Sequence, residues 1–447
     1  MNKLFNKKNA IVLGLAKSGL STALFLLKSG ANVTISALNN DVTEKDVLEL
    51  EKLGAQLIFG EHPLDILDNE VDFIIKNPGI PYSIPFLIEA SSKNIPVYSE
   101  LEITHSLLED TIAITGSNGK TTTTTLIQEI VNLEKDCITC GNIGRPLSDV
   151  VLKNDNNKTL VMELSSFQLK GTTSFKPNIS ILLNINESHL DYHKTIDDYI
   201  KAKAMITKNQ QDSDTFIYNI DDPIVNLIAH TTSAKVVPFS TDHYYEFGAS
   251  IKNDWIYYMG EKFMNTKEVA LPGKHNLQNI LAALIVAKMH SISDKNIKKV
   301  FKSFSGVEHR LQYVTTVNNR KFYNDSKATN IPAANNAVSS FGSPPILIAG
   351  GLDRGNEFDE FIPTLKKCKR VFVFGETASK IVNTATKYNL NHVVKVSSLK
   401  DAVTFSYESS EMNDVILLSP ACASWDQFKS FEERGNHYIS YVNQLKN

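Results

Sequence analysis

A short run of glycine, lysine and hydroxyl residues, GSNGKTT at residues 116–122, carries the strongest chemical signal in the chain. It lies between residues 111–115, whose composition predicts a β-strand, and residues 121–134, whose spacing predicts a helix. Glycines let backbone N–H groups face a phosphate, and the N-terminus of a helix attracts anions. A lysine can bind the β- and γ-phosphates, and a threonine hydroxyl can bind Mg²⁺. We therefore predict a phosphate loop for a nucleotide, formed by Gly116, Ser117, Asn118, Gly119, Lys120, Thr121 and Thr122.

The spacing of this run departs from the full P-loop pattern, because Ile114 occupies the position of its first glycine. The alternative is a Gly/Asn turn that merely precedes a helix. We favour the phosphate loop, since Gly-Lys-Thr between a predicted strand and a predicted helix is uncommon by accident.

Two residues that can bind a metal ion follow the next two predicted strands. Glu163 lies at the end of the apolar residues 159–164, and His189 follows residues 179–185. The carboxyl ends of parallel strands form the edge of an α/β sheet where ligands bind. Carboxylate oxygen suits Mg²⁺, whereas histidine is not its preferred ligand. Each residue taken alone could be an ordinary surface glutamate or a hydrogen-bonded histidine, but together they predict a Mg²⁺ site beside the phosphate loop.

Segments typical of strands and helices alternate along the chain and must position these residues. Strands are predicted at residues 9–13, 31–36 and 71–76 and again at residues 345–349, 370–374 and 415–419, with helices between them. Residues 195–208 and 276–289 have helical spacing, and the aromatic residues 240–267 suggest an antiparallel excursion. Such alternation predicts an α/β fold with parallel sheets covered by helices on both faces.

Length and composition limit the class of protein. The 447 residues suggest three domains at about 150 residues each. With 46 basic and 49 acidic residues the net charge is −3, which argues against a nucleic-acid binder. Four cysteines are too few for a disulfide scaffold, and Cys137 and Cys140 lack a second pair at zinc spacing. No uninterrupted apolar run reaches the ~18 residues of a membrane span, so we expect a cytoplasmic protein without membrane insertion.

Read in order, the motifs resemble those of the Mur ligases, ATP-dependent amide-bond-forming enzymes of peptidoglycan assembly that are related to folylpolyglutamate synthetase. The resemblance rests on GSNGKTT and on six further runs that extend it over the whole chain. They are ELSSFQL at 163–169, NINESHLD at 184–191, GKHNLQN at 273–279, EHR at 308–310, DSKATN at 325–330 and SPACASWDQF at 419–428. The last two resemble the D-glutamate-adding members most.

The resemblance implies three domains, each with its own ligand. A Rossmann-like domain at 1–98 would bind the UDP-sugar substrate. A P-loop ATPase-like domain with a mainly parallel sheet at 99–306 would bind ATP and Mg²⁺, and a Rossmann-like domain at 307–447 would bind the amino acid. Closure about a hinge would then be required, since Arg310, Asp325 and Lys327 must approach Lys120.

It also implies the reaction and its catalytic residues. The substrate carboxylate would attack the γ-phosphate of ATP to give an acyl phosphate, and the amine of the incoming amino acid would displace phosphate. Lys120, Glu163, His189 and Lys203 would be catalytic, and Thr121, Glu163, His189 and Lys203 would hold two Mg²⁺ ions. The family pattern makes Lys203 a carbamylated lysine, a carboxylate-like ligand, although the residue alone would be interpreted as a solvated helix lysine.

The remaining implied contacts are assigned by ligand. For ATP they are Asn276 and Asn279 near adenine, Arg310 at the phosphates and Asp325 at the ribose, although Asn276 could instead cap its helix. For the UDP-sugar they are Ser18, Ser36, Asn77, Asn142, Gln168 and His189. Ser36-Ala37-Leu38 replaces the acidic residue of a dinucleotide site and leaves uracil recognition open. For D-glutamate they are Lys327, Thr329, Arg354, Ser424, Trp425 and Phe431, although Trp425 could be an ordinary core residue.

The resemblance thus implies a ligase that joins D-glutamate to UDP-N-acetylmuramoyl-L-alanine, and we expect it to be a monomer. One alternative is another amino-acid ligase of the same family or a folate-type glutamate ligase. A P-loop protein that binds a nucleotide without ligating anything is the alternative from another class. Two of only six arginines, Arg310 and Arg354, fall in ligand-facing motifs, which supports a specific role for them.

Overall fold

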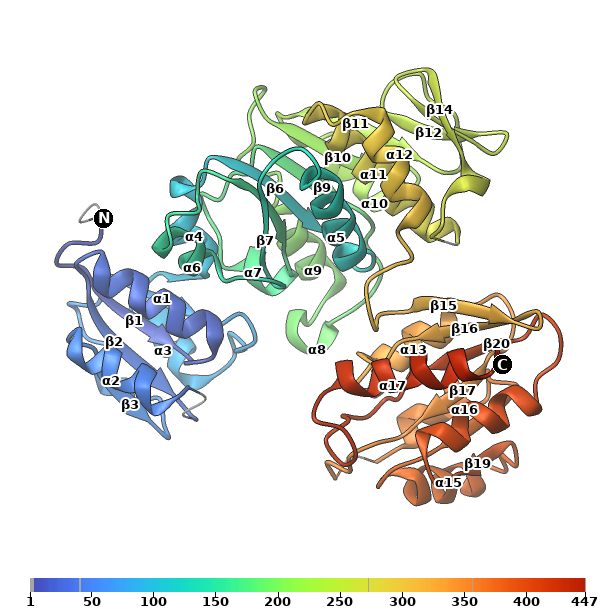
Figure 1. Ribbon diagram of the computed structural model, residues 1–447. Helices are drawn as coiled ribbons and strands as arrows, with labels where there is room; N and C mark the ends of the chain where they lie inside the picture. Colours follow the sequence, from blue (N-terminus) through green and yellow to red (C-terminus); the bar gives the residue numbers. More distant parts are fainter. Residues whose placement is uncertain (1–3, 40–41, 272, 356, 447) are drawn as a thin grey trace. The chain divides into compact units, whose positions relative to one another are not determined.

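The computed structural model describes residues 4–39, 42–271, 273–355 and 357–446. The chain folds as two compact units, Met1–Ser303 and Phe304–Asn447. Figure 1 shows that each unit consists of sheets covered by helices.

The first sheet of unit 1 has five parallel strands in the order β3-β2-β1-β4-β5. They are β1 (Asn9–Leu13), β2 (Asn32–Ala37), β3 (Gln56–Phe59), β4 (Phe73–Lys76) and β5 (Val97–Tyr98), joined by α1 (Lys17–Lys28), α2 (Glu44–Lys52) and α3 (Pro85–Ser92). Side chains of β1 alternate between two cores, because Ala10 and Val12 pack with α1 whereas Ile11 and Leu13 pack with α3. The strand order reverses between β1 and β4, so a crevice for ligands is expected at their carboxyl ends.

The second sheet of unit 1 has nine strands in the order β14-β13-β12-β11-β10-β9-β6-β8-β7. The strands β6 (Asp110–Thr115), β7 (Cys137–Gly141), β8 (Thr159–Glu163), β9 (Ile179–Leu182), β10 (Thr215–Asn219) and β11 (Lys235–Ser240) are parallel. The predicted antiparallel excursion is confirmed, since β12 (Ala249–Lys252), β13 (Trp255–Tyr258) and β14 (Glu261–Asn265) form antiparallel pairs. Its helices are α4 (Glu100–Thr104), α5 (Lys120–Val131), α6 (Leu147–Leu152), α7 (Ser166–Lys170), α8 (Leu190–His193), α9 (Ile196–Ala204), α10 (Pro223–Ala229), α11 (Lys274–Met289) and α12 (Asp294–Ser303).

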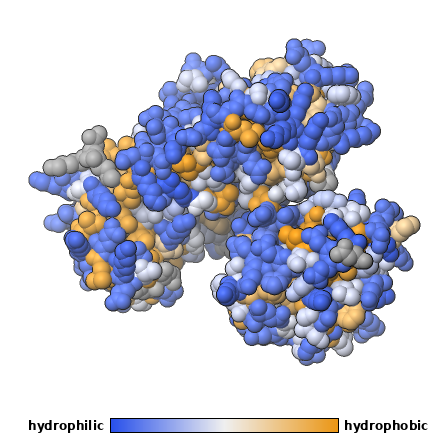
Figure 2. Space-filling model, viewed as in Figure 1, coloured by the Kyte–Doolittle hydropathy of each residue, from blue (hydrophilic) through white to orange (hydrophobic). Residues whose placement is uncertain are grey.

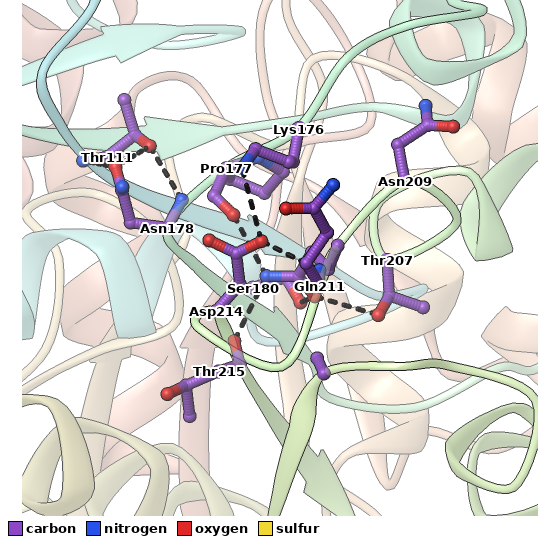
Figure 3. A network of polar contacts seen from close by, with 12 residues as sticks. Thr111, Lys176, Pro177, Asn178, Ser180, Thr207, Asn209, Gln211, Asp214 and Thr215 are labelled. Atoms are coloured by element: carbon purple, nitrogen blue, oxygen red, sulfur yellow. Dashed lines mark hydrogen bonds and ion pairs between the residues drawn. The ribbon is translucent and has the colours of Figure 1, made fainter.

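Polar side chains fix the amino ends of β6, β9 and β10 to one another (Figure 3). The Asn178 side chain accepts from the backbone N–H of Thr111 at 3.0 Å and from its hydroxyl at 2.7 Å. Asp214 accepts from the N–H of Gln211 at 2.8 Å and pairs with Lys176 at 3.5 Å. These bonds satisfy loop backbone groups at the sheet edge opposite the phosphate loop.

Unit 2 contains a six-stranded sheet in the order β15-β16-β20-β17-β18-β19. β15 (Gln312–Val317) is antiparallel to its neighbour, β16 (Arg320–Asn324). The strands β17 (Ile346–Ala349), β18 (Arg370–Val373), β19 (Val393–Lys395) and β20 (Val415–Leu418) continue the parallel part, with α13 (Ile331–Ser339), α14 (Ile362–Leu365), α15 (Ala378–Lys387), α16 (Leu399–Glu408) and α17 (Phe431–Gln444). The predicted α/β class with mainly parallel sheets is therefore confirmed.

No helix in the described residues is long and apolar enough to cross a membrane. The face seen in Figure 2 is mostly hydrophilic, and its hydrophobic residues form separate patches.

Candidate active site

The phosphate loop connects β6 to α5 in the middle of the large sheet. β6 lies between β8 and β9, so the loop is flanked by the carboxyl ends of both strands. Gly119 has φ +83° directly before α5, and a side chain there would collide with the carboxamide oxygen of Asn279. Glycine is therefore required at this position both by the left-handed backbone and by the close approach of α11. Lys120 begins the helix, and its ammonium donates to the carbonyl oxygens of Gly116 at 2.8 Å and Ser117 at 3.0 Å.

Neighbouring segments hold the loop in place. The Ser117 hydroxyl lies 2.9 Å from the Tyr199 hydroxyl of α9 and accepts from the backbone N–H of Asn186 at 2.9 Å. The N–H of Asn118 donates to the side chain of Asn184 at 2.8 Å. Because these partners follow β9 or belong to α9, the segment that carries His189 and the helix that carries Lys203 both support the loop.

Glu163 ends β8 with a buried carboxylate that is only half satisfied. Its Oε1 accepts from the Asn142 side chain at 2.7 Å, while Oε2 is buried and has no hydrogen-bond partner among the described residues. An unpaired buried carboxylate oxygen is costly unless a cation or a donor reaches it. Thr121, the second residue of α5, is also buried. The carboxylate and the hydroxyl are oxygen donors of the kind Mg²⁺ prefers, so these residues fit the ion.

Lys203 is buried behind the phosphate loop. Its residue type alone would instead suggest a solvated side chain. It is 1% exposed, and its ammonium donates to the carbonyl of Gly116 at 2.8 Å and to the Thr115 hydroxyl at 3.3 Å. Burial lowers the pKa of Lys203 well below its ordinary value, and the charge of Lys120 lowers it further against the opposing charge of Glu163. Its amine is therefore more easily neutral, and hence nucleophilic, than that of a surface lysine.

His189 lies on the other flank of the loop and is exposed. Its backbone is left-handed, with φ 56°, and its ring meets Phe167 edge-on at 5.0 Å between centroids. β8 and β9 are both neighbours of β6 but not of each other, so Glu163 and His189 flank the loop from opposite sides. Among the described residues no group of three His, Cys, Asp or Glu side chains is placed to hold a metal ion. A Mg²⁺ site here would therefore also need the Thr121 hydroxyl, nucleotide phosphates or a modified Lys203.

The two asparagines predicted near adenine share one face of α11, as their spacing indicates. Asn279 donates to the Asn276 side chain at 3.1 Å and accepts from the Thr123 hydroxyl at 3.1 Å. Asn279 is buried, and it ties α11 to α5 directly behind Gly119. Its visible contacts therefore support the phosphate loop, and an approach to adenine stays a prediction for both residues.

Two of the predicted UDP-sugar residues lie at the carboxyl edge of the first sheet. Ser18 is half-buried in the first turn of α1, and Asn77 follows β4, where its side chain accepts from the N–H of Gly79 at 3.2 Å. A side chain at Gly14 would crowd Asn77, so the loops after β1 and β4 meet closely. Ser36 is the penultimate residue of the neighbouring strand β2 but is fully buried, and its hydroxyl lies 2.7 Å from His62 Nδ1.

The other UDP-sugar candidates belong to the large sheet. Asn142 follows β7 and, as described, donates to Glu163. Gln168 completes a capping box with Ser165 at the start of α7, which occupies its carboxamide oxygen. Its role toward a ligand stays a prediction.

Unit 2 gathers its candidates at the ends of three neighbouring parallel strands. Asp325, Lys327 and Thr329 follow β16, Arg354 follows β17, and Ser424 and Trp425 follow β20. Phe431 opens α17, with its ring 5.4 Å from the Lys327 ammonium. Five of the six residues predicted for D-glutamate thus follow neighbouring strands at one edge of this sheet, and the sixth, Phe431, contacts Lys327.

The side chains of this cluster differ in exposure and in partners. Trp425 is 64% exposed rather than part of the core, and the Arg354 guanidinium lies 4.8 Å above its ring. The buried Ser424 hydroxyl has no partner in the described part of the chain.

Burial raises the pKa of Asp325 to about 6 although the Ser419 hydroxyl, the N–H of Leu311 and the nearby charge of Arg310 favour its ionised form.

Comparison with known proteins agrees with this arrangement. The model of the Mur ligase MurD-like N-terminal domain matches residues 8–99, that of the Mur ligase middle domain matches residues 114–287, and that of the Mur ligase glutamate ligase domain matches residues 309–422. UDP-N-acetylmuramoylalanine–D-glutamate ligases of Bacillus mycoides and Bacillus cereus are each 48% identical to the chain, over 99% of it and 98% of their own length. The chain belongs to the Mur ligase family.

A solved Mur ligase shares the fold at much lower identity. UDP-N-acetylmuramate-alanine ligase from Thermotoga maritima is 18% identical, with a TM-score of 0.53 over 98% of this chain and 99% of its own. The three-domain α/β fold expected for a Mur ligase is therefore confirmed.

The sequence did not single out several residues that support this Mur ligase site. Asn184 and Tyr199 hold the phosphate loop and could have been found, because Asn184 opens the NINESHLD run and Tyr199 lies in the predicted helix 195–208. Arg434 is fully buried in unit 2, where it donates to the carbonyl of Ser326 at 2.8 Å and to its hydroxyl at 3.0 Å. The scarcity of arginine was the only signal that pointed to Arg434, since its burial depends on tertiary packing.

Proposed function

We propose that this Mur ligase joins D-glutamate to UDP-N-acetylmuramoyl-L-alanine, with ATP converted to ADP and phosphate, during synthesis of the peptidoglycan precursor. The observation that carries the proposal is the 48% identity, over nearly the whole length, to ligases named for this reaction. The clustering of Lys327, Arg354 and Ser424 at one edge of unit 2 supports it, because a dicarboxylate needs cations and hydroxyl donors together.

The chemistry divides into two displacements. A carboxylate oxygen of the UDP-sugar substrate attacks the γ-phosphorus of ATP, the bond to the β-phosphate breaks, and ADP leaves. The amine nitrogen of D-glutamate then attacks the acyl carbon, the bond to phosphate breaks, and the amine loses a proton as the amide forms. Positioning and charge neutralisation dominate such transfers, which is the task we assign to Lys120 and the N–H groups of the phosphate loop.

Mg²⁺ would be held by Thr121 and Glu163, with His189 and a carbamylated Lys203 at a second ion. When bound, the ion neutralises charge on the phosphates. The unpaired Oε2 of Glu163 supports the first assignment. The lowered pKa of Lys203 supports the second, since a neutral amine is the form that reacts with CO₂.

We assign UDP-sugar binding to residues 1–98, ATP and Mg²⁺ binding to residues 99–306 and D-glutamate binding to residues 307–447. Ser18 and Asn77, at the β1–β4 edge, are our first candidates for the UDP-sugar. The four buried free cysteines support a reducing compartment, and we propose that the enzyme acts in the cytoplasm as a monomer.

Release of ADP with a panel of amino acids tests the proposal. With UDP-N-acetylmuramoyl-L-alanine and ATP present, D-glutamate should stimulate ADP release strongly. L-glutamate, L-lysine and diaminopimelate should not. Stimulation by one of the latter but not by D-glutamate would overturn the substrate assignment.

A further inference from the structure

A lysine that no part of the proposed mechanism uses is buried beside the UDP-sugar crevice. Lys76 is the last residue of β4 and is 2% exposed. Its ammonium donates to the carbonyl oxygens of Asn77 at 3.1 Å, Pro78 at 3.0 Å and Ile80 at 2.8 Å. The turn that follows β4 is therefore folded around this one cation.

The same ammonium reaches out of the first sheet to the segment that carries His189. The Tyr192 hydroxyl of α8 lies 3.0 Å from the Lys76 ammonium and 3.4 Å from the carbonyl of Ile80. α8 begins directly after His189, and Phe167 packs against both the His189 ring, at 5.0 Å, and the Tyr192 ring, at 4.4 Å. Lys76 and Tyr192 thus connect the turn that contains Asn77 with the flank of the phosphate loop.

No stabilising counter-charge for Lys76 is found among the described side chains. No ion pair joins its ammonium to a described carboxylate, and the rings of Tyr82 and Tyr192 face it at 4.7 and 5.6 Å. Burial and, less strongly, the charge of Lys170 lower the pKa of Lys76 to about 7. A buried cation without a counter-ion reduces stability unless its hydrogen bonds compensate, so its presence points to a task other than general stabilisation.

A second chain of contacts continues from α8 to α9. Lys170, beside Tyr82 and Tyr192, pairs with Asp198 at 2.6 Å, and Asp198 lies 3.2 Å from Nδ1 of the buried His193. α9 also carries Tyr199, which touches the phosphate loop at Ser117, and Lys203. Movement of the turn after β4 would therefore displace the elements that surround the phosphate loop.

We propose that Lys76 is a positioning residue, which together with Tyr192 fixes the turn after β4 to α8 and so holds the nucleotide-sugar substrate in register with His189 and the phosphate loop. This inference rests on the proposed function. Lys76 itself is too deeply buried to touch the substrate. It acts through the carbonyls of the turn, and Tyr192 acts through its hydroxyl.

The test uses two substitutions in the full-length enzyme, Lys76→Met and Tyr192→Phe. Methionine retains an unbranched apolar stem without the ammonium, and phenylalanine removes only the hydroxyl. We expect each to raise the KM for UDP-N-acetylmuramoyl-L-alanine, by about 10-fold or more for Lys76→Met, because small misplacements at a reacting centre are costly. The KM values for ATP and D-glutamate should stay within about 2-fold.

The two substitutions should also be non-additive, because they remove the same contact. The double variant should be no worse than Lys76→Met alone. Equal increases in all three KM values, no increase in any, or additive effects would overturn the proposal. Lys93→Met is the matched control, since Lys93 also donates to a backbone carbonyl of the same sheet layer, that of Leu67 at 2.8 Å, and should leave the KM values unchanged. If Lys76→Met does not fold, Tyr192→Phe alone decides by the same criterion.

Hydrogen exchange separates this proposal from the proposed function. In either variant the amides of Gly79 and Ile80, which are held within the turn, should exchange faster than in the wild type, whether or not the enzyme ligates anything. Unchanged exchange at these amides would refute the proposal that Lys76 and Tyr192 fix the turn after β4 to α8. Absent ligation by the wild type would refute the proposed function alone.

Discussion

Lys120 and Lys203 donate to the same acceptor, the carbonyl oxygen of Gly116, each at 2.8 Å. Two ammonium groups on one oxygen repel each other, and only Lys203 is almost completely buried. The proton is therefore held less firmly on Lys203 than on an ordinary lysine, and its pKa is lowered. We therefore assign Lys120 as the cation for the phosphates and Lys203 as the amine that can be modified.

The first prediction concerns modification of Lys203. In bicarbonate buffer, ¹³C-labelled CO₂ should give a carbamate signal in the wild type that is absent in Lys203→Ala. Lys203→Ala should lose most activity and regain part of it with a short carboxylic acid, which replaces the missing carboxylate. Lys201→Ala, two residues earlier on the exposed side of α9, is the control. An unmodified amine in a fully active enzyme would contradict the prediction.

Removal of the Lys120 ammonium should stop catalysis without preventing substrate binding. We expect Lys120→Ala to lower kcat by at least about 10²-fold, the typical cost of losing one charge-stabilising donor. Titration calorimetry should show unchanged binding of the UDP-sugar. Lys135→Ala, at an exposed lysine beyond α5, should retain normal turnover. Full turnover in Lys120→Ala would refute the role assigned to this lysine.

The unpaired oxygen of Glu163 predicts a selective effect on Mg²⁺. Glu163→Gln retains the shape of the side chain and an oxygen for the Asn142 bond but removes the charge. The Mg²⁺ concentration for half-maximal activity should rise about 10-fold or more, as expected when a ligand is weakened. Thermal stability without Mg²⁺ should not fall, because a buried charge without a full set of partners is removed. An unchanged Mg²⁺ dependence would exclude Glu163 as a ligand.

Glu100 predicts a dependence of stability on pH. Burial raises the pKa of this carboxyl from 4.5 to about 7, against the opposing bond from the N–H of Ser148 at 2.6 Å. The folded state thus binds a proton that the unfolded state has lost, so the free energy of unfolding falls as pH rises from about 4.5 to 7, by about 3 kcal/mol for this group. Urea denaturation gives the free energy of unfolding at pH 5 and at pH 8. The difference between these two values should be smaller in Glu100→Gln than in the wild type, by about 3 kcal/mol.

The control for this experiment is Glu102→Gln. Despite partial burial, bonds from Thr173 and Ser174 lower the pKa of Glu102. Its contribution is therefore complete above pH 5 and is lost only at lower pH. Glu102→Gln should change stability equally at pH 5 and pH 8, whereas an equal change in Glu100→Gln would contradict the assignment.

Much of the fold could be predicted from the sequence, because the spacing of apolar residues agrees with the turn residues that bound each segment. The strand before Gly116, the helix after it and the strand that ends at Glu163 are all found close to their predicted places. Bounds were less accurate where a helix begins inside a loop. α1 starts at Lys17, so Gly19 lies within the helix, where a side chain would collide with the Gly14 carbonyl.

The sequence could not predict burial of isolated charges. Lys76, Lys203 and Arg434 have no periodicity that distinguishes them from surface residues. Each is buried with a partner that is distant in sequence, Tyr192, Gly116 and Ser326 respectively. Motif order indicated a role for Lys203, but for Lys76 nothing in the local sequence did. Trp425 shows the opposite case, since an aromatic residue that could have been an ordinary core residue lies exposed, with Arg354 above its ring.

The most direct test of the account follows oxygen from one substrate to another. The substrate is UDP-N-acetylmuramoyl-L-alanine with ¹⁸O at both carboxylate oxygens. It is incubated with the full-length enzyme, ATP, Mg²⁺ and D-glutamate, and the masses of the products are measured by mass spectrometry. The account predicts an amide product that contains D-glutamate and one ¹⁸O, with the second ¹⁸O in the inorganic phosphate and one ADP per amide. Release of unlabelled phosphate without an amide product would contradict it.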